Sequence, residues 1–289
     1  DPVLASCLSK AEQKIGTSAC LPRNDQQSAF VAALPGLQAL AAKLPDGMLE
    51  SIGSTNADPI NEFMAARGLS INLPDLQSGE FACAAVLDIL VRWAIPGVRA
   101  DCDVVAPDKS EHPGVEMAKG FKIHRNDEGL EIGEPLIDGG EVTVLMCMST
   151  DLASGMDALR QSRRPSPDDY KGLMFPMIDL DMAADASIVR GLSSGGYTVT
   201  QAFAQAKLRL NEFGAHAKAG AAIVVYRGPP PKVMEIDKPF TLAFLVADQI
   251  VLAFHLTPEC WRQPPNLATK ADKAAGEVKV GAFYLDKYE

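Results

Sequence analysis

The run of residues 81–93, FACAAVLDILVRW, constrains the fold most, because it is apolar at nearly every position. A strand with one solvated face alternates apolar and polar side chains, whereas a strand covered on both faces has no such alternation. We therefore expect residues 81–93 to form a buried central strand. A chain of 289 residues that is 47% hydrophobic can bury a core large enough to cover it.

Segments with strand character follow this run along most of the chain: 117–125, 141–148, 173–181 and 202–211. The turn-rich residues 126–140 join the first two segments and predict a meander. Two later apolar runs, 240–246 and 250–256, flank Ala247-Asp248-Gln249 and predict a hairpin. The predicted fold class is α+β, with a large, mostly antiparallel sheet, packed helices and a C-terminal β-hairpin.

Helical patterns lie mainly toward the N-terminus. Apolar residues recur with a helical period over residues 28–43, although Pro35 interrupts them. Asp58 is a candidate N-cap for a second helix, which Gly68 would end. Residues 151–160 predict a further helix.

The net charge of −10 and the pI near 5.0 argue against nucleic acid or an anionic membrane as the main partner. No apolar run approaches the roughly 18 to 20 residues of a membrane span. The partner that we expect is another protein. The chain begins at Asp1 without Met, and we expect that a segment upstream was removed.

The sequence predicts neither a metal site nor a cofactor. Its six cysteines form no C-x-x-C pair, and its four histidines are scattered. Reduced core residues are the favoured interpretation of the cysteines, with disulfides as the alternative. They are Cys7, Cys20, Cys83, Cys102, Cys147 and Cys260.

We also predict that the protein is not an enzyme, since no nucleophile elbow or phosphate-binding loop is present. Asp179 and Asp181 could form a metal-binding or acid–base pair. A solvated strand face is the favoured interpretation, because no histidine or further carboxylate motif accompanies them.

Residues 211–231, NEFGAHAKAGAAIVVYRGPPP, combine alternating small residues with a proline-rich end. In an extended backbone, alternate side chains point to the same side. One side would then carry the alanines Ala215, Ala217, Ala219 and Ala221. Side chains of this size would fit a crowded sheet.

The segment from residue 207 to 256 resembles the C-terminal third of the serpins. In that family a central strand ends in an acidic residue, and a hinge of small residues, an exposed reactive loop and a final hairpin follow. The resemblance implies a hinge that comprises Glu212, Gly214, Ala215, Ala217, Ala219 and Ala221. It places the scissile bond after Gly228, or after Arg227, with Pro229 beside it.

The resemblance extends more weakly upstream and covers residues 17–256. It implies a serpin-like domain at residues 1–261 and a C-terminal extension at 262–289. Within the extension, residues 278–285 could add as a strand to a neighbouring molecule or dock on their own domain.

Departures from the serpin pattern concern the polar latch that controls the opening of the sheet. Asp88 stands where the family has Asn, Ala204 where it has His, and Met177 where it has the Lys that pairs with Glu212. The N-terminus is also too short for the family's first helices. We therefore expect a non-inhibitory serpin-like protein that acts as a binding or structural subunit; the alternative is a serine or cysteine protease inhibitor that works by loop insertion.

Overall fold

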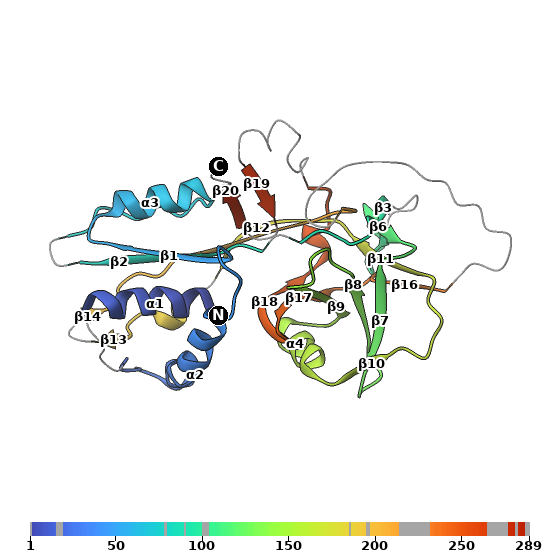
Figure 1. The fold of residues 1–289 in the computed structure, drawn as a ribbon, viewed down its shortest axis with the longest axis horizontal. Coiled ribbons are helices and arrows are strands. Elements are labelled where there is room, and N and C mark those ends of the chain that lie inside the picture. The colour runs from blue at the N-terminus through green and yellow to red at the C-terminus, as the bar shows by residue number, and fades with distance from the viewer. Residues whose placement is uncertain are drawn as a thin grey trace.

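The computed structural model describes residues 2–15, 20–77, 80–89, 91–99, 104–184, 186–194, 197–213 and 232–264, and the backbone of residues 277–280 and 283–286. Its strands form mainly antiparallel sheets, on which helices pack (Figure 1). The predicted α+β class is therefore confirmed.

The largest sheet has six antiparallel strands in the order β10-β7-β8-β9-β17-β18. Their bounds are β7 Phe121–Asn126, β8 Glu131–Pro135, β9 Thr143–Met148, β10 Arg163–Pro165, β17 Phe240–Val246 and β18 Gln249–Leu256. The predicted meander and the C-terminal hairpin are both confirmed. The hairpin turn consists of Ala247 and Asp248, with φ of 48° and 60°, as in a type I′ turn.

A four-stranded sheet has the order β16-β11-β6-β3. Its strands are β3 Val98–Arg99, β6 Gly114–Met117, β11 Gly172–Pro176 and β16 Val233–Glu235. The segments 117–125 and 173–181, each predicted as one strand, are in fact divided between sheets. Gly120, with a φ of 75°, turns the chain between β6 and β7, and Met177 donates its N–H to Pro113 between β11 and the next strand.

Two separate strand pairs complete the main architecture. One pairs β1 (Leu49–Ser54) with β2 (Ala82–Leu87), and the other pairs β12 (Ile178–Ala184) with β15 (Ala204–Leu210). Helices α1 and α3 cover opposite faces of the first pair (Figure 1). This explains why β2 is apolar throughout, as predicted.

The strand predicted over residues 81–93 is shorter than expected. It ends at Leu87, where pairing with the six-residue β1 also ends. Beyond that point the chain continues to Trp93, which forms an isolated bridge with Ile137.

The helices are α1 Pro2–Ile15, α2 Asp25–Ala41, α3 Ala57–Ala66 and α4 Leu152–Arg160. The N-cap of α3 is Asn56 rather than Asp58, because the Asn56 side chain accepts the Asp58 N–H. Pro35 lies inside α2 without ending it. The N-terminal segment thus holds two helices, although we expected it to be too short for the first helices of the family.

The remaining elements are short. They are β4 Val104–Val105, β5 Glu111–His112, β13 Ser193–Ser194, β14 Tyr197–Thr198, β19 Glu277–Val280, β20 Phe283–Asp286, and the 3₁₀ helices η1 Ser187–Val189 and η2 Pro258–Cys260. The segment 278–285, which we expected to act as one strand, therefore contributes to two antiparallel strands, β19 and β20, and β20 lies near β15. The domain boundary at residue 261 stays a prediction. Across the described ranges, we find no helix whose length and hydropathy would let it cross a membrane.

Candidate functional site

A slot separates the two strand pairs. The outer edge of β2 is bonded to β1 and that of β15 to β12, whereas β2 and β15 belong to different sheets. We call the space between β2 and β15 the strand slot. Within the described residues, β2 pairs only with β1 and β15 only with β12, so each wall of the slot has an edge of the kind that accepts a further strand.

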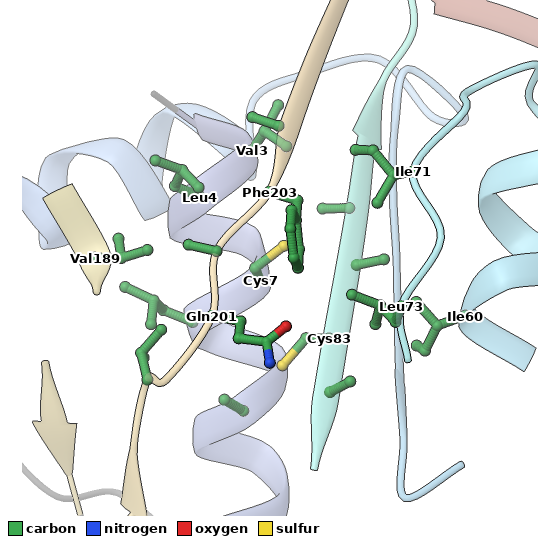
Figure 2. A pocket seen from close by; sticks show the side chains of 18 of the residues that line it. Val3, Leu4, Cys7, Ile60, Ile71, Leu73, Cys83, Val189, Gln201 and Phe203 are labelled. Carbon is green, nitrogen blue, oxygen red and sulfur yellow. The ribbon is translucent and has the colours of Figure 1, made fainter. Parts of the chain in front are cut away.

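A cavity of about 1130 Å³ occupies the strand slot. Helix α1 lines one side of it, through Val3, Leu4 and Cys7, while Ile60 and its neighbours line another (Figure 2). A water molecule takes up only about 30 Å³ of the liquid. The cavity is therefore far larger than a packing defect.

The walls of the cavity are mostly apolar and include two thiols. Burial raises the pKa of Cys7 to about 12 and the pKa of Cys83 to about 11. Both thiols are therefore neutral at physiological pH. All five cysteines in the described ranges, Cys7, Cys20, Cys83, Cys147 and Cys260, are free, as predicted, and Cys102 lies outside those ranges.

At one end the strand slot is closed by three hydrogen bonds, which we call the clasp. The indole Nε1 of Trp93 donates to the main-chain oxygen of Asn211 at 3.0 Å. The N–H of Trp93 donates to Phe213 at 3.3 Å, and that of Gly97 donates to Glu212 at 2.7 Å. The clasp holds the chain just where β15 leads into residues 214–231.

The three replaced latch positions lie at different places around the strand slot. Met177 has an uncharged side chain that cannot replace the missing cation, and it is 1% exposed in the main core. Ala204 begins β15 and pairs with Ala184. Asp88 is 5% exposed and donates its N–H to Met48 immediately after β2 ends. None of these side chains can reproduce the Lys–Glu latch of the serpin pattern.

A second polar anchor lies after residues 214–231. The ammonium of Lys232 is 2.9 Å from the Asp168 carboxylate and 4.5 Å from the centre of the Tyr170 ring. Arg125 contacts Asp168 at 2.8 Å and Glu131 at 2.7 Å. Because Lys232 directly precedes β16, this network fixes the start of that strand.

Of the predicted hinge residues, the structure describes Glu212. It lies in the clasp, where its main-chain oxygen accepts the hydrogen bond from the N–H of Gly97. The other predicted site residues lie outside the described residues: Gly214, Ala215, Ala217, Ala219, Ala221, Arg227, Gly228 and Pro229.

The two aspartates on β12 form ion pairs with β15, as expected for a partly solvated strand face. Asp181 is 2.8 Å from Lys207, and Asp179 is 3.1 Å from Arg209. Partial burial opposes ionisation of Asp181, but hydrogen bonds from Lys207 and Gln205 outweigh it and lower its pKa. Within the described ranges, no group of three or more His, Cys, Asp or Glu residues could hold a metal ion.

The sequence analysis did not predict the clasp or the residues of α1 that line the cavity. A tryptophan at the end of an apolar run was visible as a possible donor, but its acceptor is a main-chain oxygen that no residue type reveals. The apolar residues of α1 had a readable signal, since Val3 and Cys7, like Leu4 and Leu8, lie four positions apart.

The fold is similar to solved serpin structures. One similar structure is thyroxine-binding globulin in complex with thyroxine, at a TM-score of 0.56 and 15% identity, covering 88% of this chain and 90% of that one. Another is Serpin48 of the insect Tenebrio molitor, at a TM-score of 0.53 and 11% identity, covering 88% of this chain and 95% of that one. A human thyroxine-binding globulin structure gives a TM-score of 0.50 at 13% identity, covering 86% and 88%.

No protein-family model and no curated protein sequence matches this chain. Identities of 11–15% establish the fold alone. The chain therefore has a serpin-like fold.

Proposed function

We propose that the protein inhibits a protease by taking residues 214–231 into the strand slot, which is the alternative to the non-inhibitory subunit that the sequence favours. The observation that supports this function best is the strand slot itself, which lies between two strand edges of separate sheets. The residues that would fill it follow the end of β15, one of its walls, after three intervening residues. Protein interiors are close-packed, so alternating alanines suit such an insertion.

The proposed reaction begins as ordinary proteolysis. The active-site serine or cysteine of the protease attacks the carbonyl carbon of Gly228, or that of Arg227. The C–N bond breaks, the new amine takes a proton, and the carbonyl carbon remains bound to the protease as an ester or thioester. Insertion of the freed segment would then move the attached protease and distort its active site before water can hydrolyse the ester or thioester.

The second candidate is a non-inhibitory binding or structural subunit. It is favoured by buried Met177, which leaves Glu212 without the cation of the serpin latch. The described residues show no side-chain partner for Glu212. A loop without the latch could serve as a recognition surface for a protein partner and need not insert.

Cleavage followed by a thermal melt separates the two candidates. The protein is treated with a trypsin-like protease, the cut is located by mass spectrometry, and the melting temperature of the cut protein is measured. Insertion should raise the melting temperature sharply, because the new strand would pair with both walls of the strand slot. A cut without a gain in stability would count against inhibition and favour the subunit.

A pair of arginine variants tests the insertion step. Ala215→Arg would place a charge on the inward side of the segment and should abolish a covalent complex with the protease on a denaturing gel. His216→Arg adds the same side chain on the opposite side and should leave the complex unchanged. Equal complex formation by both variants would overturn the proposed mechanism.

A further inference from the structure

We infer that the cavity in the strand slot binds an elongated, uncharged lipid-like molecule. This inference is independent of loop insertion, since it concerns the protein with the strand slot open. A volume of about 1130 Å³ slightly exceeds the range of about 300–1,000 Å³ that is usual for small-molecule sites. The cavity is therefore large enough for a ligand with a long alkyl chain.

The shape of the cavity favours a long ligand over a compact one. Its walls include two consecutive stretches, residues 80–85, which run into β2, and residues 201–206, which run into β15, with six residues each. At about 3.3 Å per residue, these walls run for roughly 20 Å. A single alkyl chain could lie along them, on the apolar face that α1 presents through Val3, Leu4 and Leu8.

Exposed apolar side chains are concentrated at this cavity. Among the described residues, eight large hydrophobic side chains are conspicuously exposed, and four of the eight line the cavity. They are Phe203 at 50%, Met182 at 49%, Tyr197 at 46% and Leu152 at 39%. Phe203 and Gln201 project from the segment before β15 toward the space beside Cys7 and Cys83 (Figure 2). An apolar ligand would remove these surfaces from water.

The charges around the cavity select against a fatty acid. The described lining contains no Lys or Arg, and its only basic residue is His255. Three acidic residues, Glu12, Asp75 and Glu80, belong to the same lining. A carboxylate would be desolvated near like charges with no lysine or arginine to pair with it. A hydroxyl could instead exchange hydrogen bonds with groups such as the Gln201 amide.

Competition between an alcohol and an acid of equal chain length tests this inference on the intact protein. Nile red is titrated until its fluorescence saturates, and dodecanol or dodecanoate is then added at pH 8. We expect dodecanol to displace the dye at least tenfold more effectively than dodecanoate. Non-saturable Nile red binding, or equal displacement by the two compounds, would overturn the inference.

Two variants locate the binding site. Cys7→Trp fills the cavity from α1 and should weaken Nile red binding at least tenfold. Val105→Trp adds the same ring at an exposed position outside the cavity lining and should not change binding. Circular dichroism and thermal melting check that both variants fold.

A measurement on the unmodified protein covers the case in which Cys7→Trp fails to fold. Dodecanol at saturation should slow N-ethylmaleimide modification of Cys7 and Cys83 at least fivefold, as followed by mass spectrometry, and leave modification of Cys260, outside the lining, unchanged. Equal protection of all three thiols, or none, would contradict binding at this cavity.

Discussion

The indole nitrogen of Trp93 lies 3.0 Å from the main-chain oxygen of Asn211 and donates a hydrogen bond to it. The two residues are 118 positions apart, and both are buried. This bond joins the segment that follows β2 to the last residue before the hinge. It closes one end of the strand slot at the point where an inserting strand would have to begin.

Trp93→Phe should therefore lower the free energy of unfolding by about 1–3 kcal/mol, because it leaves a buried carbonyl without its donor. Urea denaturation measures the change. Trp261→Phe is the matched control: Trp261 is equally buried, but no partner for its Nε1 is found within the described ranges. A larger loss in Trp261→Phe than in Trp93→Phe would contradict the importance of this bond.

Gly155→Ala should destabilise the protein by about 1–3 kcal/mol through overpacking. A Cβ atom at this position in α4 would overlap the Thr241 side chain on β17. Gly36→Ala in α2 is the control, since a Cβ there meets nothing within 4 Å. It should stabilise the protein by about 0.5–1 kcal/mol through helix propensity. Thermal or urea unfolding distinguishes the opposite signs, and a loss in both variants would show that the close packing at Thr241 is not the cause.

The ion pair at Glu134 should make stability depend on pH. Partial burial opposes ionisation of Glu134, but the hydrogen bond to His124 at 2.5 Å and the nearby Lys122 ammonium lower its pKa. A carboxyl group with a lowered folded-state pKa stabilises the fold above its unfolded value of about 4.3. That contribution is lost as the pH falls through the folded-state pKa.

Glu134→Gln should thus be less stable than the native protein at pH 7, and the difference should shrink as the pH falls from 5 to 3. Urea unfolding at several pH values in this range measures it. Glu141→Gln changes an exposed glutamate and should follow the native curve at every pH. A constant difference between Glu134→Gln and the native protein down to pH 3 would contradict the lowered pKa.

Asp168→Asn should loosen the start of β16, because Lys232 loses its carboxylate partner at 2.9 Å. The other strands of this four-stranded sheet keep their own hydrogen bonds and buried side chains, so the expected effect is local to β16. Hydrogen exchange at residues 233–235 should become several-fold faster. Asp169→Asn removes the neighbouring, exposed pair with Lys171 and should leave this exchange unchanged.

Much of the fold could be predicted because its signals are local. The hairpin of β17 and β18 follows from two apolar runs around a short polar turn. Helix α4 follows from Asp151, whose side chain caps it as part of a capping box. The prediction was less accurate where two nearby residues suited the same role. Asn56 and Asp58 are both suitable N-cap residues for α3, and in the structure Asn56 is the N-cap.

The candidate site was much harder to predict. The strand slot depends on which strands fail to pair, and no residue pattern within β2 or β15 records that. The clasp depends on main-chain oxygens of residues 211–213, which every amino acid type carries. The sequence could indicate that residues 214–231 suit a sheet, but only the tertiary structure identifies the gap beside them.

The width of the four-stranded sheet can be compared with the length of residues 214–231, which connect its two edges. The clasp at Gly97 immediately precedes β3, one edge of this sheet, and Lys232 precedes β16, the opposite edge. Three strand spacings of about 4.8 Å separate these edges, or roughly 14 Å. The 18 residues from 214 to 231 have a contour length of about 60 Å. When fully extended, the connection between the two anchors would thus be about four times as long as this sheet is wide, so the two anchors do not require it to be extended.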